Sequence, residues 1–577
     1  EESALTGETI PSLKDSSKIL KENTAMGDLC NMVFATTIVV NGHGEAIVVE
    51  TGMNTRVGKI AGMIIEDESP ETPIQKKLAE VGKILAIACI IICVLIFVIG
   101  IFKKIPIIEM FMTSVGLAVA AIPEGLPAIV TIMLSIGVTK MAKKNSIIRK
   151  LPAVETLGSS SVICSDKTGT LTQNKMTVTE IRNCFGRANS NERKFILELG
   201  TMCTDTTEER INGKLGFVGE ATEVAISNAA MEEGVSKSFL YDEMKRINDI
   251  PFDSKRKMMT TIHKYGNEYR IITKGAPDVL LKRCSNCYSG GQIVPIFSKK
   301  DDINEQNNQM AEKALRVIAV AYKDVEKLPE MQDVEKDLIF CGLIGMIDPP
   351  REGVKEAVRT CRRAGIKTVM ITGDHLQTAK AIAKELGILK DLAIDGETLE
   401  RMSQHELEQN IMDYSVFARV SPEHKVRIVK AFQSTGAVVA MTGDGVNDAP
   451  ALKNADIGIA MGKGGTDVAK NAADMILLDD NFVTIVEAVK QGRNIYDNIK
   501  KAIHFLISTN IGEIVTIFFG LVLGIKSPLL AIQLLWINLV TDSLPAIALG
   551  LEKPEKDIMK RKPRDAKEGI FANGLGV

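Results

Sequence analysis

The stretch SVICSDKTGTLT, residues 161–172, places Asp166 after an apolar run and before a loop of threonine and glycine. Such a run predicts a short buried strand that holds the carboxylate rigidly at its end. The small residues that follow let backbone N–H groups approach an anionic phosphate. A carboxylate in this position can act as a nucleophile that accepts a phosphoryl group. The other reading, open on this stretch alone, is an ordinary turn at the end of a strand.

Two later stretches repeat the pattern. MITGD, residues 370–374, ends an apolar run and precedes a helical pattern, and AMTGDGVNDAPAL, residues 440–452, does so again. Units of strand, turn and helix predict a doubly wound α/β domain, whose ligands bind at the carboxyl ends of the strands. This arrangement would bring together five residues: Asp166, Thr372, Gly373, Asp444 and Asp448.

A carboxylate nucleophile beside a phosphate needs Mg²⁺ to offset the negative charge. Asp444 is the expected Mg²⁺ ligand, and Lys425 in SPEHKVRIVK would supply positive charge to the phosphoryl group. Taken alone, Lys425 also fits a solvated position on a helix. The three strand-end stretches together favour the phosphate-binding reading.

Composition excludes one class of partner. The chain has 577 residues and a net charge of −2, which favours several domains and gives no basic excess for binding nucleic acid. Ten cysteines are present, and Cys284 with Cys287 forms a lone CxxC. No second pair completes a metal site, so we expect free thiols in a reducing compartment. No obligatory protein partner is evident.

Four apolar segments predict transmembrane helices at 84–102, 107–138, about 502–525 and about 528–551. They form two hairpins on either side of a long polar region. Lysines and arginines gather at the hairpin bases, for example Lys143, Lys144, Lys500 and Lys501, although Lys103, Lys104 and Lys526 lie in the far turns. The positive-inside rule therefore predicts that the polar region is cytosolic.

Polar residues inside these segments indicate an ion path. Asn510 and Glu513 share one helix face, as do Asn538, Thr541 and Asp542, and Glu124 lies between Pro123 and Pro127. Prolines break the helix and free backbone carbonyls. Three carboxylates with amide, hydroxyl and carbonyl oxygens suit a hard cation such as Ca²⁺. The alternative is polar contact between helices.

The motifs DKTGTLT, TGD and TGDGVNDAP, in this order between two membrane hairpins, resemble those of the P-type ATPases. The resemblance covers essentially the whole chain. IPEGLP at 122–127, STNIGE at 508–513 and NLVTD at 538–542 are similar to the calcium pumps, of the sarco/endoplasmic-reticulum or bacterial kind. The resemblance implies an ATP hydrolase that translocates Ca²⁺, with Mg²⁺ as cofactor, and a chain that is a fragment of a longer pump.

The resemblance implies a role for each matching residue. Asp166 would carry the phosphate, with Lys167 and Thr168 beside it and a Thr168 carbonyl on the Mg²⁺ that Asp166 and Asp444 bind. Asn447 and Asp448 would support that site. The transferred phosphate would be held by Thr372, Gly373, Asp374 and Lys425. Glu8, in the LTGE stretch, would orient the water that hydrolyses the aspartyl-phosphate.

ATP would contact five positions: Glu223, Phe252, Lys274, Arg316 and Arg419, with Phe252 stacking on adenine. Without the resemblance, Phe252 would be read as a core residue. Transported Ca²⁺ would bind Glu124, Asn510, Glu513, Asn538, Thr541, Asp542 and the carbonyls of Val119, Ala120 and Ile122. Whether one or two ions bind stays open.

The expected fold is a multi-domain membrane protein. It would combine part of a β-rich actuator domain (1–75), transmembrane hairpins (76–140 and 491–552), a haloacid-dehalogenase-like α/β phosphorylation domain (141–175 and 346–490), an α+β nucleotide-binding insert (176–345) and a cytosolic segment (553–577). The compact insert favours a microbial plasma membrane. The alternatives are a pump for Mn²⁺, Na⁺ or H⁺, and a membrane-tethered phosphatase of the same fold.

Overall fold

The computed structural model describes residues 2, 11–21, 24, 29–40, 44–62, 73–102, 106–120, 125–211, 214–253, 256–523, 525, 529–565 and 568. It contains two compact units. The first comprises Glu1–Leu171, Glu352–Gly373 and Leu386–Val577, and the second comprises Thr172–Arg351 and Asp374–Glu385. Glu8, Ile122 and Glu124, three of the predicted site residues, lie outside the described residues.

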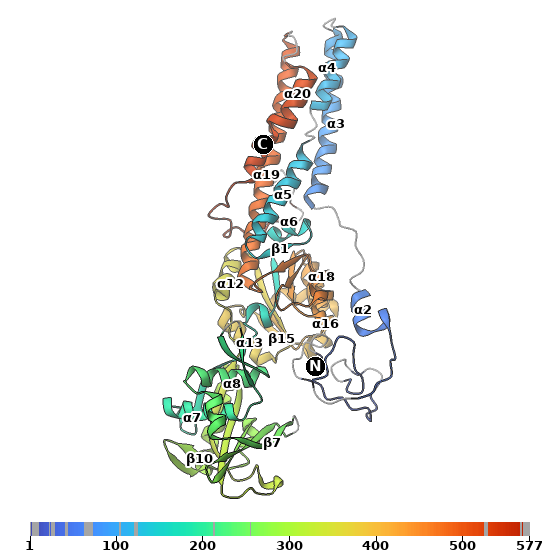
Figure 1. The fold of residues 1–577 in the computed structure, drawn as a ribbon. Helices are drawn as coiled ribbons and strands as arrows, with labels where there is room; N and C mark the ends of the chain where they lie inside the picture. Colours follow the sequence, from blue (N-terminus) through green and yellow to red (C-terminus); the bar gives the residue numbers. More distant parts are fainter. Residues whose placement is uncertain are drawn as a thin grey trace. The chain divides into compact units, whose positions relative to one another are not determined.

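An eight-stranded sheet forms the centre of the first unit, in the order β1-β19-β18-β17-β2-β14-β16-β15 (Figure 1). The strands are β1 (Ser146–Ile148), β2 (Val162–Asp166), β14 (Lys367–Thr372), β15 (Leu392–Asp395), β16 (Tyr414–Ala418), β17 (Val439–Gly443), β18 (Ile457–Met461) and β19 (Met475–Leu477). All neighbours are parallel except β1 and β19. The inner strands are nearly continuous apolar runs because both faces of a parallel sheet are buried.

The helices of this α/β domain are α6 (Pro152–Ser159), α12 (Val354–Arg363), α14 (Gly396–Arg401), α15 (Gln404–Asn410), α16 (Pro422–Ser434), α17 (Ala449–Asn454) and α18 (Asp467–Ala472), and α13 (Leu376–Leu386) follows β14. Helix α16 begins where the sequence dictates. Ser421 caps it by accepting the His424 N–H, and Pro422 occupies its first turn. This start fixes the register of Lys425, one turn into the helix.

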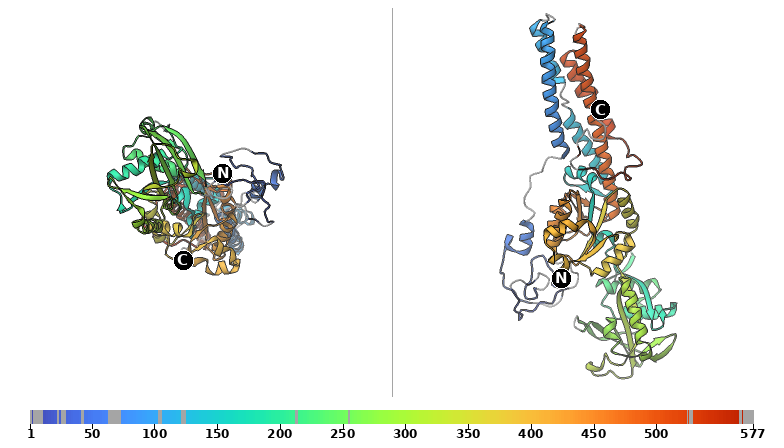
Figure 2. Two further views of the ribbon diagram at one scale, coloured as in Figure 1. Left: turned by 90° about the horizontal axis from the view of Figure 1, so that it is seen from below. Right: turned by 180° about the vertical axis from the view of Figure 1, so that it is seen from behind.

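Apolar helices make up the rest of the first unit's described core. They are α3 (Pro73–Phe102), α4 (Ile107–Ala120), α5 (Leu126–Ala142), α19 (Phe482–Val522), α20 (Ala531–Trp536) and α21 (Ser543–Gly550), with the π-helical turn η8 (Ile537–Thr541) between the last two. Buried Ile96, Met110, Ile517 and Leu534 form one cluster to which α3, α4, α19 and α20 each contribute a residue. These helices run side by side in Figures 1 and 2.

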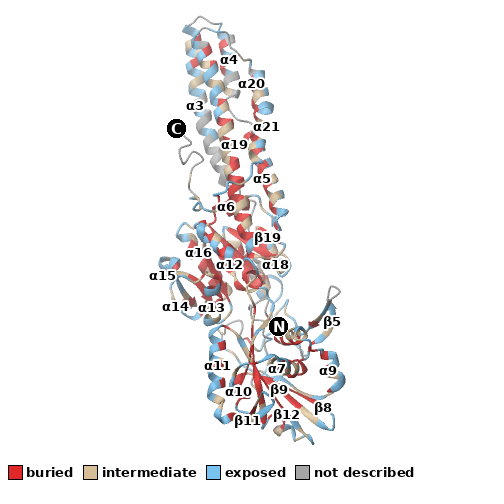
Figure 3. Ribbon diagram, turned by 90° about the vertical axis from the view of Figure 1, so that its left-hand side faces the viewer, coloured by how far each residue is buried: buried red, intermediate tan, exposed pale blue. Residues whose placement is uncertain are grey.

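The outer faces of this helical group are apolar and exposed, as Figure 3 shows in pale blue for α3, α4 and α20. Ile90, Phe102, Phe111, Ile532 and Trp536 are among the exposed side chains. Large exposed apolar surfaces of this kind mark contact with lipid or with another protein. Two helical stretches of the described residues, Phe482–Gly520 and Ile532–Gly550, are long and apolar enough to cross a membrane, and Ile90–Phe102 and Leu126–Ala142 are shorter.

Helix α19 is longer than the sequence suggested. It runs unbroken for 41 residues from Phe482 to Val522. The domain boundary predicted between residues 490 and 491 therefore falls inside a continuous helix. The reason is that residues 482–501 carry enough charge to be read as a separate soluble helix, although nothing in them ends it.

The second unit has a nine-stranded sheet. Seven of its strands follow the order β11-β10-β13-β12-β9-β8-β7, and the other two branch from it, with β3 pairing with β13 and β4 pairing with β3. The strands are β3 (Thr177–Asn183), β4 (Gly186–Arg187), β7 (Arg246–Asp253), β8 (Met258–Tyr265), β9 (Glu268–Gly275), β10 (Cys284–Ser289), β11 (Gln292–Pro295), β12 (Arg316–Val325) and β13 (Leu338–Ile347). A separate hairpin joins β5 (Thr207–Ile211) to β6 (Lys214–Val218).

Helices α7 (Ser190–Met202), α8 (Ala221–Glu232), α9 (Lys237–Glu243), α10 (Pro277–Leu280) and α11 (Lys300–Glu312) complete the second unit. Alternate residues of β12 enter different cores: Val320 and Tyr322 join one cluster, and Ala319 and Ala321 the other. This is the period of two expected for a strand with both faces covered.

The predicted β-rich character of residues 1–75 is wrong for the described residues. They contain no strand, and their helical elements are η2 (Gly52–Asn54), α2 (Arg56–Gly62) and the start of α3. The apolar runs Ile38–Val40 and Ile47–Val49, which resemble strands in sequence, are exposed. A strand needs a hydrogen-bonding partner, and among the described residues neither run has one.

Candidate functional site

Three parallel strands deliver the predicted phosphate-binding residues to one edge of the first sheet. Strand β2 lies between β17 and β14, and Asp166 is level with Ile371, one residue before Thr372. Strand β17 ends at Gly443, immediately before Asp444. The structure thus brings Asp166, Thr372 and Asp444 to neighbouring strand ends, because parallel strands that are hydrogen bonded in register end together.

Lys425 reaches this edge from α16 and serves two carboxylates. Its Nζ donates to Asp166 Oδ2 at 2.9 Å and to Asp448 Oδ1 at 2.5 Å. Burial opposes a charge on Lys425, but Asp166 and Asp448 outweigh burial and raise its pKa above the usual value. The open reading of Lys425 as a solvated helix residue is therefore wrong: the side chain is buried and ion-paired.

Asp448 is fully engaged within the protein. Besides Lys425, its carboxylate accepts the N–H groups of Asp444 at 3.1 Å and Gly445 at 3.0 Å. Asn447, its neighbour in η7 (Val446–Asp448), is buried beside it. Asp448 therefore fixes the loop after β17, and Asp444 and Asp166 are left to face a ligand.

The loop after β2 passes close to Asp444. The Thr168 N–H donates weakly to Asp166 Oδ1 at 3.4 Å. Gly169 has a φ of +73°, and a Cβ there would lie 3.4 Å from Asp444 Oδ2. The glycine thus lets the turn pass close to Asp444 in a conformation that other residues avoid. Lys167 is buried in the same turn, η3 (Lys167–Leu171).

The carboxylates fit a hard divalent cation. Asp166, Asp444 and Asp448 have oxygens within 4.8 Å of one another, and they are the one group of potential metal ligands of this kind in the described residues. Burial, with repulsion from Asp166 and Asp448, raises the pKa of Asp444 to about 7, although Lys425 opposes the shift. A bound cation would offset the repulsion that keeps one of these carboxylates partly protonated. A donor set made only of oxygens suits Mg²⁺.

The second unit brings three of the five predicted ATP-contacting residues together. Lys274 on β9 donates to Glu223 Oε1 at 2.5 Å, with Glu223 in the first turn of α8. Arg316, the first residue of β12, donates to Thr222 Oγ1 at 3.1 Å. Both cations therefore converge on the beginning of α8, a suitable place for an anionic ligand.

Phe252 lies on β7 and is 62% exposed. The reading of Phe252 as a core residue is therefore excluded, whereas an exposed aromatic ring fits stacking on a base. Arg419 directly follows β16 in the first unit and has a φ of +50°, so it does not share a unit with the other four residues. Asp374 follows β14 and is counted with the second unit.

The apolar helices carry buried polar groups on two elements. Asn510, Asn538 and Asp542 are buried, and Glu513 is half-buried. Glu513 lies close enough to Asp542 for the two carboxylates to repel each other, with Asn538 beside Glu513. No lysine or arginine of the described residues forms an ion pair with either carboxylate. Two carboxylates among apolar helices, without a basic partner in the described residues, make this a candidate cation site.

One predicted face differs. Thr541 is exposed, although regular helical spacing would place it beside Asn538 and Asp542. The reason is the π-helical turn η8, in which the Asp542 N–H bonds to the Ile537 carbonyl at 2.9 Å. A π turn has more residues per turn, so it shifts side chains away from the α-helical face. Val119 and Ala120 are the last residues of α4.

Thr442 was not among the predicted site residues. Its Oγ1 accepts the Asp166 N–H at 3.1 Å and so fixes the strand end that carries the nucleophile. Thr-Gly-Asp occurs both at 372–374 and at 442–444, so this repeat could have indicated Thr442 from the sequence.

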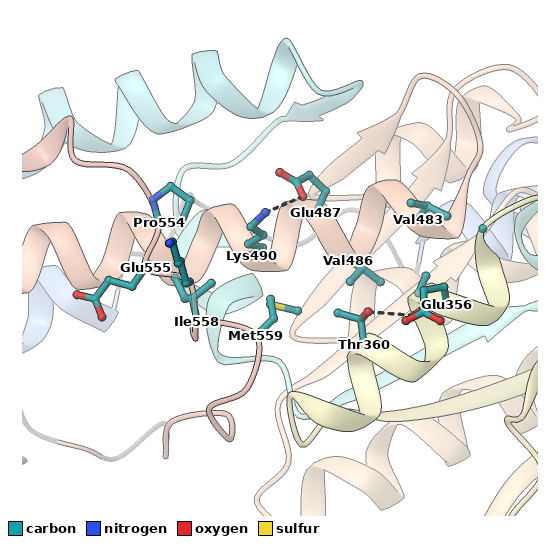
Figure 4. A pocket seen from close by; sticks show the side chains of 13 residues that line it. Glu356, Thr360, Val483, Val486, Glu487, Lys490, Pro554, Glu555, Ile558 and Met559 are labelled. Atoms are coloured by element: carbon teal, nitrogen blue, oxygen red, sulfur yellow. Dashed lines mark hydrogen bonds and ion pairs between the residues drawn. The ribbon is translucent and has the colours of Figure 1, made fainter.

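A cavity among the described residues lies elsewhere. It measures about 710 Å³ and lies between α12, α19 and the segment Pro554–Met559 (Figure 4). Its walls are apolar at Val486 and Met559, and its rim carries the ion pair between Lys490 and Glu487 at 3.5 Å. None of the predicted site residues lines it, so the cavity takes no part in the phosphate site.

Comparisons with known families match most of the chain. Residues 193–353 match the P-type ATPase cytoplasmic domain N, residues 1–65 the P-type ATPase actuator domain, and residues 526–577 the C-terminus of cation transporting ATPases. Residues 293–456 and 425–489 match haloacid dehalogenase-like hydrolases.

Curated relatives align with the whole chain. A calcium-transporting ATPase of Bacillus subtilis is 50% identical, and the alignment covers 100% of this chain and 68% of that protein. Calcium-transporting ATPase 1 of Bacillus cereus is also 50% identical, with 66% of it covered. Calcium-transporting ATPase type 2C member 1 of Bos taurus is 41% identical, with 62% covered. The chain thus spans about two thirds of the length of these relatives.

Proposed function

We propose that this chain, which belongs to the P-type ATPase family, is the core of a pump that uses ATP to move Ca²⁺ across a membrane. The observation that carries the proposal is the Lys425–Asp166 ion pair of 2.9 Å beside Asp444. This ion pair places the proposed nucleophile, Asp166, beside the carboxylates that would bind a cation. The names of the relatives, calcium-transporting ATPases, support Ca²⁺ as the ion.

In the first step, an Asp166 carboxylate oxygen attacks the terminal phosphorus of ATP. The new O–P bond forms as the bond to the β-phosphate oxygen breaks, and ADP leaves. Lys425 neutralises charge on the nucleophile and on the phosphoryl oxygens, and the Thr168 N–H is positioned to donate to them. Thr372 and Gly373 border the same space from β14.

Asp166, Asp444 and the Thr168 carbonyl would hold Mg²⁺, which supplies positive charge to the transferred phosphoryl group. Asp448 holds the loop that carries Asp444 through two backbone N–H groups. Asn447 and Lys167 support the site from either side. In a second step, water attacks the phosphorus of the aspartyl-phosphate, Glu8 orients that water, and phosphate leaves Asp166.

ATP would be delivered by the second unit. The exposed Phe252 ring is free to stack on adenine, and Lys274 and Arg316 offer positive charge beside Glu223. Arg419, a further proposed contact of the nucleotide, belongs to the first unit, as does the acceptor Asp166.

The transported ion would bind in the apolar helices. Glu513 and Asp542 provide negative charge, and Asn510 and Asn538 provide amide oxygens. Glu124 and the carbonyls of Val119, Ala120 and Ile122 complete the proposed ligand set, and the exposed Thr541 is left out of it. We propose four membrane spans, formed by α3, by α4 with α5, by α19, and by α20 with α21. The two catalytic units would then be cytosolic in a microbial cell.

The test is transfer of radiolabelled phosphate from ATP to the intact pump, with and without micromolar Ca²⁺. We expect labelling of Asp166 that needs both Mg²⁺ and Ca²⁺, and none in Asp166→Asn. Labelling of Asp166→Asn would refute the nucleophile. Stimulation by Mn²⁺ or Na⁺ in place of Ca²⁺ would identify another cation, and labelling that ignores every ion would indicate a tethered phosphatase.

A further inference from the structure

Lys237 is a buried cation in the second unit that the proposed chemistry does not use. It is the first residue of α9 and is 6% exposed. Burial of an ammonium group is costly, and the beginning of a helix carries partial positive charge that repels a cation. Burial lowers the pKa of Lys237 to about 8. Strong local contacts must offset these costs.

Lys237 Nζ lies 5.5 Å from the centroid of the Tyr241 ring, and its hydrogen-bond acceptors are four oxygens of two residues. Lys237 Nζ lies 2.8 Å from Thr204 Oγ1, 3.4 Å from the Thr204 carbonyl, 2.8 Å from Thr206 Oγ1 and 2.6 Å from the Thr206 carbonyl. These residues flank Asp205 in a segment that has no regular secondary structure. Thr206 Oγ1 also lies 2.9 Å from Ser227 Oγ on α8. Lys237 therefore fixes a loop that no helix or strand ladder holds.

Asp205, at the centre of that loop, contacts the proposed nucleotide site. Its backbone N–H donates to Glu223 Oε2 at 2.8 Å, while Lys274 Nζ donates to Glu223 Oε1 at 2.5 Å. The Asp205 carboxylate accepts from Arg246 Nη1 at 2.8 Å. Each oxygen of Glu223 thus has its own donor, and one of these donors depends on the loop that Lys237 holds.

We propose that Lys237 is a positioning residue for the nucleotide site: it holds Thr204 and Thr206 so that the Asp205 amide orients Glu223 toward the adenine nucleotide. This inference rests on the proposed role of Glu223 in binding ATP. Lys237 acts through the loop, so its removal weakens nucleotide binding and leaves phosphoryl chemistry at Asp166 intact. The loss expected is that of a group which orients a binding residue, about tenfold in affinity.

The experiment measures two activities of the intact pump. The first is the ATP concentration for half-maximal labelling of Asp166, and the second is hydrolysis of p-nitrophenyl phosphate, a phosphoryl donor without adenine. Lys237→Met and Lys237→Gln remove the charge, and Lys237→Arg restores it with a different shape. Lys264→Met, at an exposed lysine on β8, is the matched control.

We expect Lys237→Met and Lys237→Gln to raise the half-saturating ATP concentration about tenfold, with maximal labelling and p-nitrophenyl phosphate hydrolysis unchanged. Lys237→Arg should recover part of the affinity, and Lys264→Met should match the wild type. An equal loss of both activities, or failure of both charge-removing variants to fold, would show a structural role and overturn the proposal.

Glu223→Gln distinguishes a failure of the Lys237 role from a failure of the proposed nucleotide site. If Glu223→Gln weakens ATP binding and the Lys237 variants do not, the positioning role alone is refuted. If Glu223→Gln leaves the ATP dependence unchanged, the proposed nucleotide site fails, and the role of Lys237 fails with it.

Discussion

At the proposed phosphorylation site, Lys425 contacts two carboxylates. Lys425 pairs with Asp166 and with Asp448, and Asp448 in turn holds the backbone of Asp444 and Gly445. Removing the Lys425 charge would leave buried carboxylates without a partner, which is costly in a low-dielectric site. The nucleophile and the metal-binding loop therefore depend on the same side chain.

Phe252 gives the simplest residue-level prediction. Loss of its exposed ring in Phe252→Ala should remove stacking on adenine, which is typically worth about 1–3 kcal/mol per base. The half-saturating ATP concentration for Asp166 labelling should rise about tenfold or more. Phe297→Ala, at a phenylalanine that is 93% exposed, is the control and should leave it unchanged. Equal effects of the two variants would contradict the stacking role.

His263 predicts a pH dependence of stability in the second unit. Nδ1 lies 3.1 Å from the Met244 carbonyl, to which it can only donate, and Nε2 lies 2.9 Å from Thr261 Oγ1. Burial lowers the pKa of His263 to about 4, below the value of about 6.5 in an unfolded chain. The unfolded state therefore binds this proton more readily between those pH values, and stability is lost as the pH falls through them.

Between pH 7 and pH 5 this single group should lower the free energy of unfolding by about 2 kcal/mol. Hydrogen exchange of the β8 amides at the two pH values measures the change. His263→Gln should reduce it, and His405→Gln, at an exposed histidine on α15, should not. An undiminished pH dependence in His263→Gln would contradict the assignment.

At the scale of elements, α19 joins the α/β domain to the apolar helices through a close crossing with α6. A Cβ on Gly492 would lie 2.7 Å from the Val154 carbonyl oxygen, and one on Gly158 would lie 2.7 Å from the Gly492 carbonyl carbon. The two backbones are thus in direct contact, and no side chain fits between them.

Gly492→Ala should force this crossing apart at a cost of about 1–3 kcal/mol. The thermal midpoint of the intact pump, followed by loss of labelling capacity, should fall. Gly512→Ala on the same helix meets nothing within 4 Å, so it should be neutral or stabilising. A midpoint for Gly492→Ala equal to the wild type would show that α6 and α19 do not meet at these glycines.

The sequence predicted those elements whose signal is local. Strand ends at Asp166, Thr372 and Gly443 follow from apolar runs that stop at threonine and glycine, and the α/β sheet confirms the expected order of strand, turn and helix. Features set by tertiary packing could not be predicted in this way. The crossing of α19 with α6 at Gly492 and Gly158 joins residues far apart in the sequence, and the π turn η8 has no sequence signature of its own.

Single residues likewise divide into those that a motif predicts and those that only the folded structure reveals. Asp166 and Asp444 stand in motifs, so their proximity was expected. Lys237 stands in an ordinary polar stretch, and only the folded loop of Thr204 and Thr206 reveals its contacts. The family itself was predicted correctly from the motifs, and the relatives and family matches confirm it.

At the scale of the whole molecule, two proposed sites must act together: the phosphate site and the ion site. The phosphate site lies at a sheet edge, and the buried carboxylates lie in apolar helices, of which α19 belongs to both the crossing with α6 and the ion site. Occupation of the ion site is proposed to control whether Asp166 accepts phosphate. Under this proposal, the ion controls a reaction that it does not touch.

The most direct test is the Ca²⁺ dependence of Asp166 labelling from ATP in Asp542→Asn, with Glu487→Gln, elsewhere on α19, as the control. We predict that Asp166 of the wild type and of the control is labelled only with micromolar Ca²⁺. Labelling of Asp542→Asn should need a Ca²⁺ concentration at least about tenfold higher. Labelling of the wild type to the same extent without Ca²⁺, or an unchanged Ca²⁺ dependence in Asp542→Asn, would contradict it.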